Sequence, residues 1–261
     1  MLTTRSVNGA PNRLAVGTPD LDGTVSFYGS LFGWRFGPAG PGAGGHGLFR
    51  LGGGTVAGGV RTTPEQGPSS WTVYFRTADA EATAKAARQA HGRVLVPPAD
   101  VADQGRTAVL ADRAGVPFGI RQPGGTGGLD LAGQPGSLSW VELYTPDIAA
   151  AAAFYHAVLG LETAAVSFPG GVYTCLNPAG TGEEAMFGGM VPLADDATET
   201  EPSWLPYFGV ADTDAVLARA RELGGTVRLP ATDVQGVGRV ARLTDPYGAR
   251  FAVIEGVPRR E

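Results

Sequence analysis

The stretch TPDLDGTVSFYGSLFGW over Thr18–Trp34 occurs a second time as TPDIAAAAAFYHAVLGL over Thr145–Leu161. Two further stretches repeat in the same order: WTVYFRTADAEATAKAARQAHGRVLVP from Trp71 matches WLPYFGVADTDAVLARARELGGTVRLP from Trp204, and GRTAVLADRAGVPFGI from Gly105 matches GRVARLTDPYGARFAVI from Gly238. Because three matches follow one order, the 261 residues are expected to be two copies of one domain of ordinary size.

The repeats predict two domains joined by a linker rich in glycine and proline. The first domain is placed at residues 1–122, the linker at 123–136 and the second domain at 137–261. Each half also repeats a pattern of its own, in which a short strand is followed by a helix and then by several short strands. The four expected units span residues 12–62, 69–122, 137–191 and 202–255.

Helices are predicted from the spacing of apolar residues. Val25, Tyr28 and Phe32 follow one another at i, i+3 and i+7, which places them on one helix face. Asp20 is expected to cap the start of this helix and Gly33 its end, with Asp147 and Gly160 in the same roles in the second half. The remaining two helices are placed at residues 79–91 and 212–223, and are expected to end at Gly92 and Gly224.

Composition excludes several classes of partner. The formal charge of −5 includes no run of basic residues, so nucleic acid and anionic membranes are not expected to bind. The single cysteine, Cys175, leaves no possible disulfide within the chain. With no apolar run of about 18 residues and no apolar core near the N-terminus, we expect a cytoplasmic protein.

The repeated order TPD-x6-FY-x4-G, SWxxYF-x2-AD and GRxAxLxDxxG resembles the glyoxalase/bleomycin-resistance/dioxygenase (vicinal-oxygen-chelate) superfamily, and within it the tandem actinobacterial glyoxalase-like proteins. The resemblance implies an α+β fold of four βαβββ units, which form two curved mixed β-sheets with helices on the convex side. Members of this superfamily include lyases, isomerases and dioxygenases that use a divalent metal, and proteins that bind drugs without one. The fold alone therefore selects no function.

The same resemblance implies where metal ligands would stand. Those positions are Ala15, Thr72, Glu142 and Leu205 on first strands, and Gly119 and Ala252 on last strands. Only Glu142 can ligate strongly, whereas a catalytic divalent ion needs about three protein ligands. The three histidines His46, His91 and His156 share no metal-binding spacing, and Glu255 could contribute only if the last strand were shifted. We therefore expect no metal and no cofactor.

Strand alternation indicates which side chains share a face with these positions. Glu142 and Tyr144 are the candidate catalytic residues, because an inward-facing carboxylate beside a tyrosine could transfer protons. The candidate ligand-binding residues are Arg13, Thr72, Tyr74, Trp140, Leu205 and Tyr207. Aromatic residues with few charges suit a flat, apolar ligand.

Structural roles compete with functional ones at several of these positions. Trp71 and Trp204 are expected in the core, and Asp112 and Asp245 are expected to fix turns. Cys175 is expected to be a small buried residue. For Glu142, a pairing with an arginine stays as open as a role in the site.

The leading hypothesis is metal-independent binding of a small aromatic or polycyclic ligand, for sequestration or antibiotic resistance. A metal-free enzyme of secondary metabolism that uses Glu142 as acid or base is the alternative, and a metal-dependent lyase or dioxygenase is disfavoured by the ligand count. In a further hypothesis only one half binds a ligand, since equivalent positions hold Ala15 in the first half and Glu142 in the second. Four units in one chain are compatible with a monomer or a homodimer.

Overall fold

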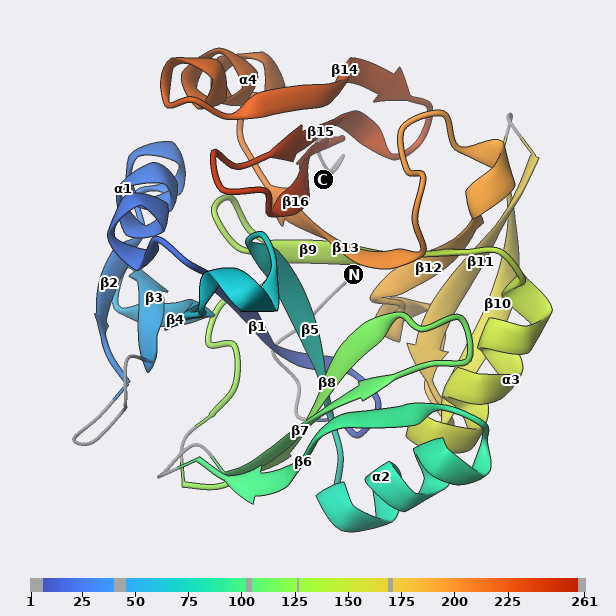
Figure 1. The fold of residues 1–261 in the computed structure, drawn as a ribbon. Coiled ribbons are helices and arrows are strands. Elements are labelled where there is room, and N and C mark those ends of the chain that lie inside the picture. Colours follow the sequence, from blue (N-terminus) through green and yellow to red (C-terminus); the bar gives the residue numbers. More distant parts are fainter. Residues whose placement is uncertain (1–6, 40–45, 102–104, 126, 169–170, 258–261) are drawn as a thin grey trace.

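The computed structural model describes residues 7–39, 46–101, 105–125, 127–168 and 171–257. Sheet A, an eight-stranded mixed sheet, comes entirely from the first half of the chain, in the order β2-β3-β4-β1-β5-β8-β7-β6 (Figure 1). Its strands are β1 Pro11–Thr18, β2 Arg35–Pro38, β3 His46–Leu51, β4 Gly54–Arg61, β5 Ser70–Arg76, β6 Arg93–Asp100, β7 Gly105–Ala111 and β8 Pro117–Pro123. Helices α1 (Leu21–Phe32) and α2 (Ala80–Gln89) follow β1 and β5.

Sheet B repeats this arrangement in the second half, in the order β10-β11-β12-β9-β13-β16-β15-β14. Its strands are β9 Leu138–Thr145, β10 Leu161–Phe168, β11 Gly171–Pro178, β12 Gly188–Pro192, β13 Ser203–Gly209, β14 Thr226–Val234, β15 Gly238–Thr244 and β16 Arg250–Gly256, with helices α3 (Ile148–Leu159) and α4 (Thr213–Glu222). The predicted α+β fold of four βαβββ units in tandem is therefore confirmed. None of the helices in the described part of the chain is both long and apolar enough to span a membrane.

Each helix begins at an aspartate. The side chain of Asp20 accepts a hydrogen bond from the backbone N–H of Gly23, and Asp147 does the same for Ala150. Gly33 and Gly160 end α1 and α3 in the left-handed conformation, as predicted. The prediction that Gly92 ends α2 is wrong by one residue, because His91 takes the left-handed conformation there, with a φ of 66°. Gly224 stands at the equivalent position after α4.

Helices from opposite halves pair with each other. In Figure 1, α1 lies beside α4 and α2 beside α3, and both pairs are in contact. Trp71 and Trp204 are buried between the halves, as predicted, and each donates a 2.9 Å hydrogen bond to a tyrosine hydroxyl, that of Tyr28 or Tyr155. The core is therefore continuous across both halves.

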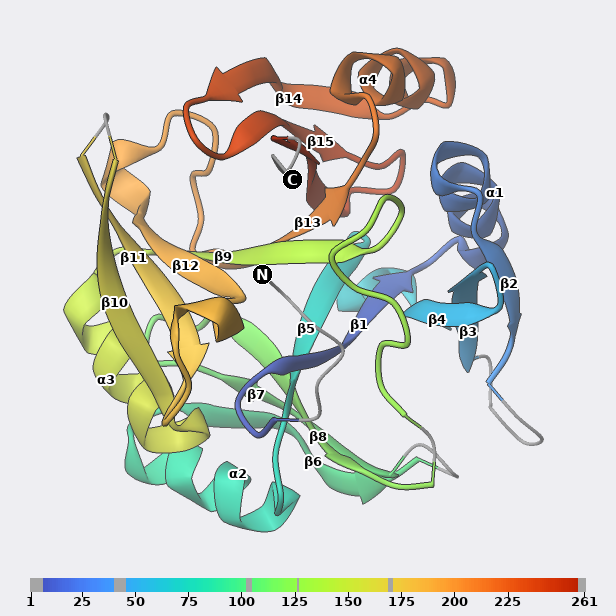
Figure 2. The ribbon, with the colours of Figure 1, turned by 180° about the vertical axis from the view of Figure 1, so that it is seen from behind.

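The segment between the sheets runs along one end of sheet A (Figure 2). The backbone N–H of Leu129 donates to the carbonyl of Asn12 on β1, and the carboxylate of Asp130 accepts from the N–H of Thr55 on β4. Both contacts lie at the same end of the parallel pair β1 and β4. These contacts of the segment between the sheets therefore lie at the end of sheet A and not at its middle.

Candidate ligand-binding site

Each sheet has a second face that points away from the main core. Along β1 and β5, residues such as Leu14 and Val73 are fully buried in that core, and the alternate residues turn to the opposite side. On sheet A we call this side the A face, formed by Arg13, Ala15, Gly17, His46, Thr72, Tyr74 and Val109. On sheet B we call it the B face, formed by Trp140, Glu142, Tyr144, Tyr173, Leu205, Tyr207 and Arg242.

Glu142 is the centre of a hydrogen-bonded cluster on the B face. The hydroxyls of Tyr144 and Tyr207 each donate a 2.5 Å hydrogen bond to Oε2 of Glu142, and that of Tyr173 donates a 2.8 Å bond to Oε1. Trp140 Nε1 donates to the hydroxyl of Tyr173 at 3.0 Å. Both carboxylate oxygens therefore already have partners from the protein itself.

The tyrosines of this cluster are held in their neutral form. Burial raises the pKa of Tyr144 and of Tyr207 well above the ordinary range, and the neighbouring Glu142 carboxylate raises both further. A neutral phenol is a hydrogen-bond donor, and a carboxylate with several donors is a stable arrangement inside a protein. The cluster can thus serve as a fixed internal support, or as a short path for a proton.

A loop closes the B face from outside. Leu193 packs against the apolar part of the face, which includes Tyr144 and Leu205. Asp196 accepts a 2.6 Å hydrogen bond from Arg242, whose guanidinium lies 5.0 Å from the ring centre of Tyr144 and 4.0 Å from Oε2 of Glu142. Loop 193–202 is therefore attached directly to the centre of this face.

A second attachment lies further along the same loop. The carboxylate of Glu199 is fully buried between two arginines, at 2.5 Å from Arg228 of β14 and 2.9 Å from Arg250 of β16. Because truncating one partner of a buried ion pair leaves an uncompensated charge, such a contact holds its geometry firmly. Loop 193–202 thus forms ion pairs with one arginine on each of β14, β15 and β16.

The duplication allows the two faces to be compared position by position. Residues at equivalent ladder positions are given with the first-half residue first. They are Arg13 and Trp140, Ala15 and Glu142, Gly17 and Tyr144, His46 and Tyr173, Thr72 and Leu205, Tyr74 and Tyr207, and Val109 and Arg242. At four of these positions a large residue of the B face is replaced by Ala15, Gly17, His46 or Val109. Several of the groups that fill the B face therefore have smaller counterparts on the A face.

The contacts of loop 193–202 also have no counterpart among the described residues of the first half. The three arginines of β14, β15 and β16 align with Leu95, Val109 and Pro117. Leu95 and Val96 are 46% and 51% exposed, which is high for aliphatic side chains. The A face therefore presents apolar side chains to solvent where the B face has a loop held by ion pairs.

The side chains present do not fit a divalent cation. Among the positions that the family resemblance implied, the A face has Ala15, Thr72 and Gly119, and the B face has Glu142 between Leu205 and Ala252. In the part of the chain that the structure describes, no three His, Cys, Asp or Glu side chains come together. One carboxylate with three neutral phenols is not a donor set that holds a catalytic metal.

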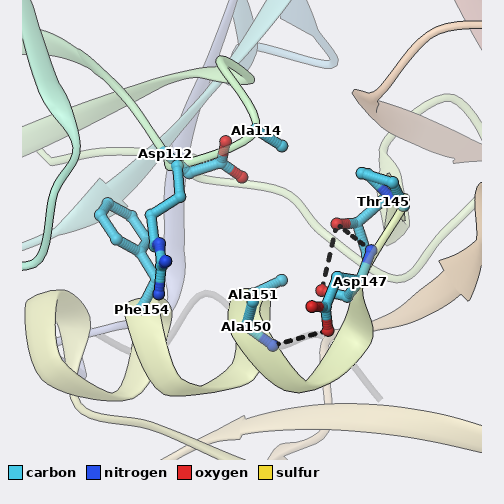
Figure 3. A pocket seen from close by; sticks show the side chains of 9 residues that line it. Asp112, Ala114, Thr145, Asp147, Ala150, Ala151 and Phe154 are labelled. Carbon is cyan, nitrogen blue, oxygen red and sulfur yellow. Dashed lines mark hydrogen bonds between the residues drawn. The ribbon is translucent and has the colours of Figure 1, made fainter.

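A separate cavity of about 220 Å³ lies between the halves (Figure 3). It is bounded by the turn that contains Asp112 and Ala114 and by the first turn of α3, where Asp147 caps the helix. In the other copy of this arrangement, Tyr247 stands in place of Ala114, and its hydroxyl donates to Asp20. The cavity therefore lies where the first half has the methyl group of Ala114 and the second half has the ring of Tyr247.

The structure brings the predicted residues together in two groups. Trp140, Glu142, Tyr144, Leu205 and Tyr207 meet on the B face, whereas Arg13, Thr72 and Tyr74 meet on the A face. Sequence reasoning missed Tyr173, Arg242 and Asp196. The replacement of Val109 by Arg242 in otherwise matching repeats was a signal that could have revealed the role of Arg242.

The comparisons agree with this architecture. The profile of the Glyoxalase/Bleomycin resistance protein/Dioxygenase superfamily matches residues 10–120 and 137–253. The chain therefore belongs to this superfamily. It is 39% identical to the anthracycline biosynthesis protein DauV of Streptomyces sp. (strain C5), over 97% of this chain and 95% of the relative. It is also 39% identical to the anthracycline biosynthesis protein DnrV of Streptomyces peucetius, with the same shares covered.

A solved structure with the same fold is the Mn(II)-bound glyoxalase from Novosphingobium aromaticivorans. Its TM-score is 0.63 at 15% sequence identity, and the match covers 98% of this chain and 87% of the glyoxalase. At this level of identity the likeness establishes the fold alone, since one fold carries many activities.

Proposed function

We propose that the chain binds a flat aromatic or polycyclic small molecule on the A face without a metal ion, in the secondary metabolism of the cytoplasm. The observation that carries this proposal is the difference between the two faces. The second half fills its face with Glu142, Tyr144 and Tyr173, and the first half has Ala15, Gly17 and His46 in their places. The smaller side chains favour the A face over the B face as the place of a ligand.

The chemistry of the A face supports a planar ligand. The ring of Tyr74 lies across Gly119, where a side chain of any other residue would overlap it, so one aromatic surface is held flat against the sheet. Val109, Leu95 and Val96 extend the apolar surface beside it. A flat apolar surface with few polar groups is typical of sites for fused-ring molecules.

The two relatives named for anthracycline biosynthesis support the same class of ligand, because anthracyclines are fused-ring aromatic compounds. Sequestration or resistance, and participation in a biosynthetic step, are both compatible with such binding. In either role the partner is a small molecule, which a monomer or a homodimer can bind.

The test uses an anthraquinone as probe and protein dialysed against a chelator. We expect wild-type protein to bind the probe, and Gly17→Tyr to lose binding because it restores the ring that the B face has at this position. Tyr144→Phe, which alters the equivalent residue of the B face, is the matched control and should bind normally. Loss of binding on metal removal, or full binding by folded Gly17→Tyr, would contradict the proposal.

A second candidate, a metal-free enzyme, is favoured by the 2.5 Å hydrogen bond from Tyr144 to Glu142. In that case Glu142 accepts a proton from the substrate and Tyr144 returns one. Product analysis by mass spectrometry with Glu142→Gln tests it, since turnover at the normal rate in this variant excludes Glu142 as the base.

A further inference from the structure

The cavity of about 220 Å³ between the halves has a counterpart in the other copy of the interface, where the ring of Tyr247 lies against α1. The cavity is lined by the turn after β7 and by the start of α3 (Figure 3). Most of the lining residues are identical in the two copies, among them Asp112, Asp147 and Phe154, which correspond to Asp245, Asp20 and Phe27. The copy with Tyr247 thus shows which group such a surface accommodates.

The space beside Ala114 has room for one aromatic ring. A cavity of about 150 Å³ is large enough to bind benzene, and this cavity is larger. Sites for drug-sized molecules begin at about 300 Å³, so a fused-ring molecule is too large. Phe154 and Ala151 form an apolar wall and are only 2% and 7% exposed. The size and the wall therefore favour a single ring.

A carboxylate of the cavity stands where the other copy receives a hydroxyl group. In that copy the hydroxyl of Tyr247 donates to Asp20, whose counterpart in the cavity is Asp147. The side chain of Asp147 accepts a 2.9 Å hydrogen bond from the backbone N–H of Ala150. Because an ionised carboxylate accepts several hydrogen bonds, Asp147 can accept one more from a ligand.

The buried hydroxyl of Thr145 is a second polar group in the lining, and it lacks a partner that its counterparts have. The equivalent threonines of the first two units form short hydroxyl pairs, Thr18 with Thr24 at 2.8 Å and Thr77 with Thr83 at 2.6 Å. In the third unit the partner position is Ala151, and Thr145 keeps only 3.4 Å contacts with the backbone of Asp147. A hydroxyl group in the cavity would therefore meet two polar groups of the lining.

The charges around the cavity favour a neutral hydroxyl over an amine. The start of α3 carries the positive end of the helix dipole, and Arg113 also lines the cavity. An ammonium group would lie close to both. The carboxylate of Asp112 already accepts from the N–H of Val116 and from the hydroxyl of Tyr155. Asp147 is therefore the carboxylate that remains for a ligand.

We propose that this cavity binds a single-ring phenol, whose ring lies as the ring of Tyr247 does in the other copy and whose hydroxyl donates to Asp147. The methyl group of Ala150 stands where that tyrosine has its hydroxyl, since a Cβ at the equivalent Gly23 would overlap it. A free phenol is not attached to the turn and can lie further from α3 than a tyrosine side chain. Once bound, it contacts both halves and stabilises the folded chain.

The experiment titrates the protein with p-cresol, which is the side chain of tyrosine as a free molecule, and with toluene, which lacks the hydroxyl. Wild-type protein should bind one equivalent of p-cresol, at least about tenfold more tightly than toluene, the effect of a hydrogen bond to a charged group. Ala114→Phe fills the ring position and should bind neither. Ala179→Phe, at an exposed position beside the far end of α3, is the matched control and should bind as wild type does.

Two further variants test the hydroxyl and the equivalence of the two copies. Asp147→Asn keeps the helix cap and should lose the preference for p-cresol over toluene. Tyr247→Ala opens the second copy, where Gly23 leaves room for the hydroxyl, and should bind a second equivalent. Saturation with p-cresol should leave the affinity for the anthraquinone probe unchanged, so this inference and the proposed function fail separately.

Three results would overturn the phenol site. They are no binding of p-cresol by wild-type protein, equal affinity for p-cresol and toluene, and full binding by folded Ala114→Phe. If Ala114→Phe does not fold, an unchanged preference in Asp147→Asn overturns the proposal in its place.

Discussion

The hydroxyl of Tyr28 donates a 3.2 Å hydrogen bond to the carboxylate of Asp245, although the two residues belong to opposite halves of the chain. Tyr155 and Asp112 form the same bond, also at 3.2 Å, on the other side of the interface. Each aspartate also accepts backbone N–H groups of its own turn, as predicted for these residues. The contact between halves is therefore made twice with the same residue types.

Removal of one tyrosine hydroxyl should destabilise the whole chain. In Tyr28→Phe, the indole N–H of Trp71 and one oxygen of Asp245 lose a partner while they remain buried. We expect the free energy of unfolding to fall by about 1–3 kcal/mol, measured by urea denaturation. Tyr247→Phe removes a hydroxyl nearer the surface and should cost less than half as much. An equal loss in both variants would contradict a special role for the buried pair.

Loop 193–202 should loosen in acid through Asp196. Burial by itself raises the pKa of this carboxyl, but hydrogen bonds from Arg242 and from the N–H groups of Glu199 and Thr198 outweigh it and lower the pKa to about 2. Because the folded-state pKa is depressed from 3.8, the stabilisation is present above about pH 4 and is lost as the pH falls toward 2.

The measurement is the difference in unfolding free energy between wild-type protein and Asp196→Asn. It should be about 2 kcal/mol at pH 6 and approach zero near pH 2. Other carboxylates titrate in both proteins and cancel in the difference. A difference that does not change between pH 6 and pH 2 would show that the ionised form of Asp196 contributes nothing.

The cavity beside Ala114 should accept a ring when space is made for its hydroxyl. Tyr247, the counterpart of Ala114, requires Gly23, because a Cβ at that glycine would overlap the tyrosine hydroxyl. Ala150 is the counterpart of Gly23. We expect Ala114→Tyr and Ala150→Gly each to be neutral or destabilising. The double variant should be more stable, by about 1 kcal/mol, than the sum of the two single effects predicts. Simple additivity in thermal unfolding would contradict the proposed equivalence.

Glu142→Gln should destabilise the B face without weakening ligand binding on the A face. The variant replaces a charged acceptor of three hydroxyl donors by a neutral amide, and hydrogen bonds to charged groups are worth about 1.5–3 kcal/mol each. A fall of at least about 2 kcal/mol in unfolding free energy is expected, with the dissociation constant for the anthraquinone probe unchanged. Loss of binding in a folded variant would instead place the ligand on the B face.

Much of the fold follows from local signals in the sequence. Asp20 and Asp147 mark the starts of helices because their side chains accept backbone N–H groups that the helix leaves without partners. Alternation along strands identified Trp140, Tyr144 and Tyr207 as sharing a face with Glu142. His91 was harder to predict, since histidine rarely takes the left-handed conformation that its second-half counterpart, Gly224, takes readily.

The content of each face depends on contacts between distant segments. Tyr173 reaches Glu142 from β11, and Asp196 reaches Arg242 from a loop in which the repeat has no match. Alternation predicts the side on which a residue lies, but not which long side chains meet across several strands. The comparison of Ala15 with Glu142 indicated that the halves differ, and the structure adds which of them is filled.

The most direct test of the central claim is a crystal structure of metal-free protein with the anthraquinone probe. We expect the ring system against Tyr74 and Val109 on sheet A, and loop 193–202 still joined to Arg242. A probe on sheet B in place of that loop, or one held through a metal ion, would contradict it.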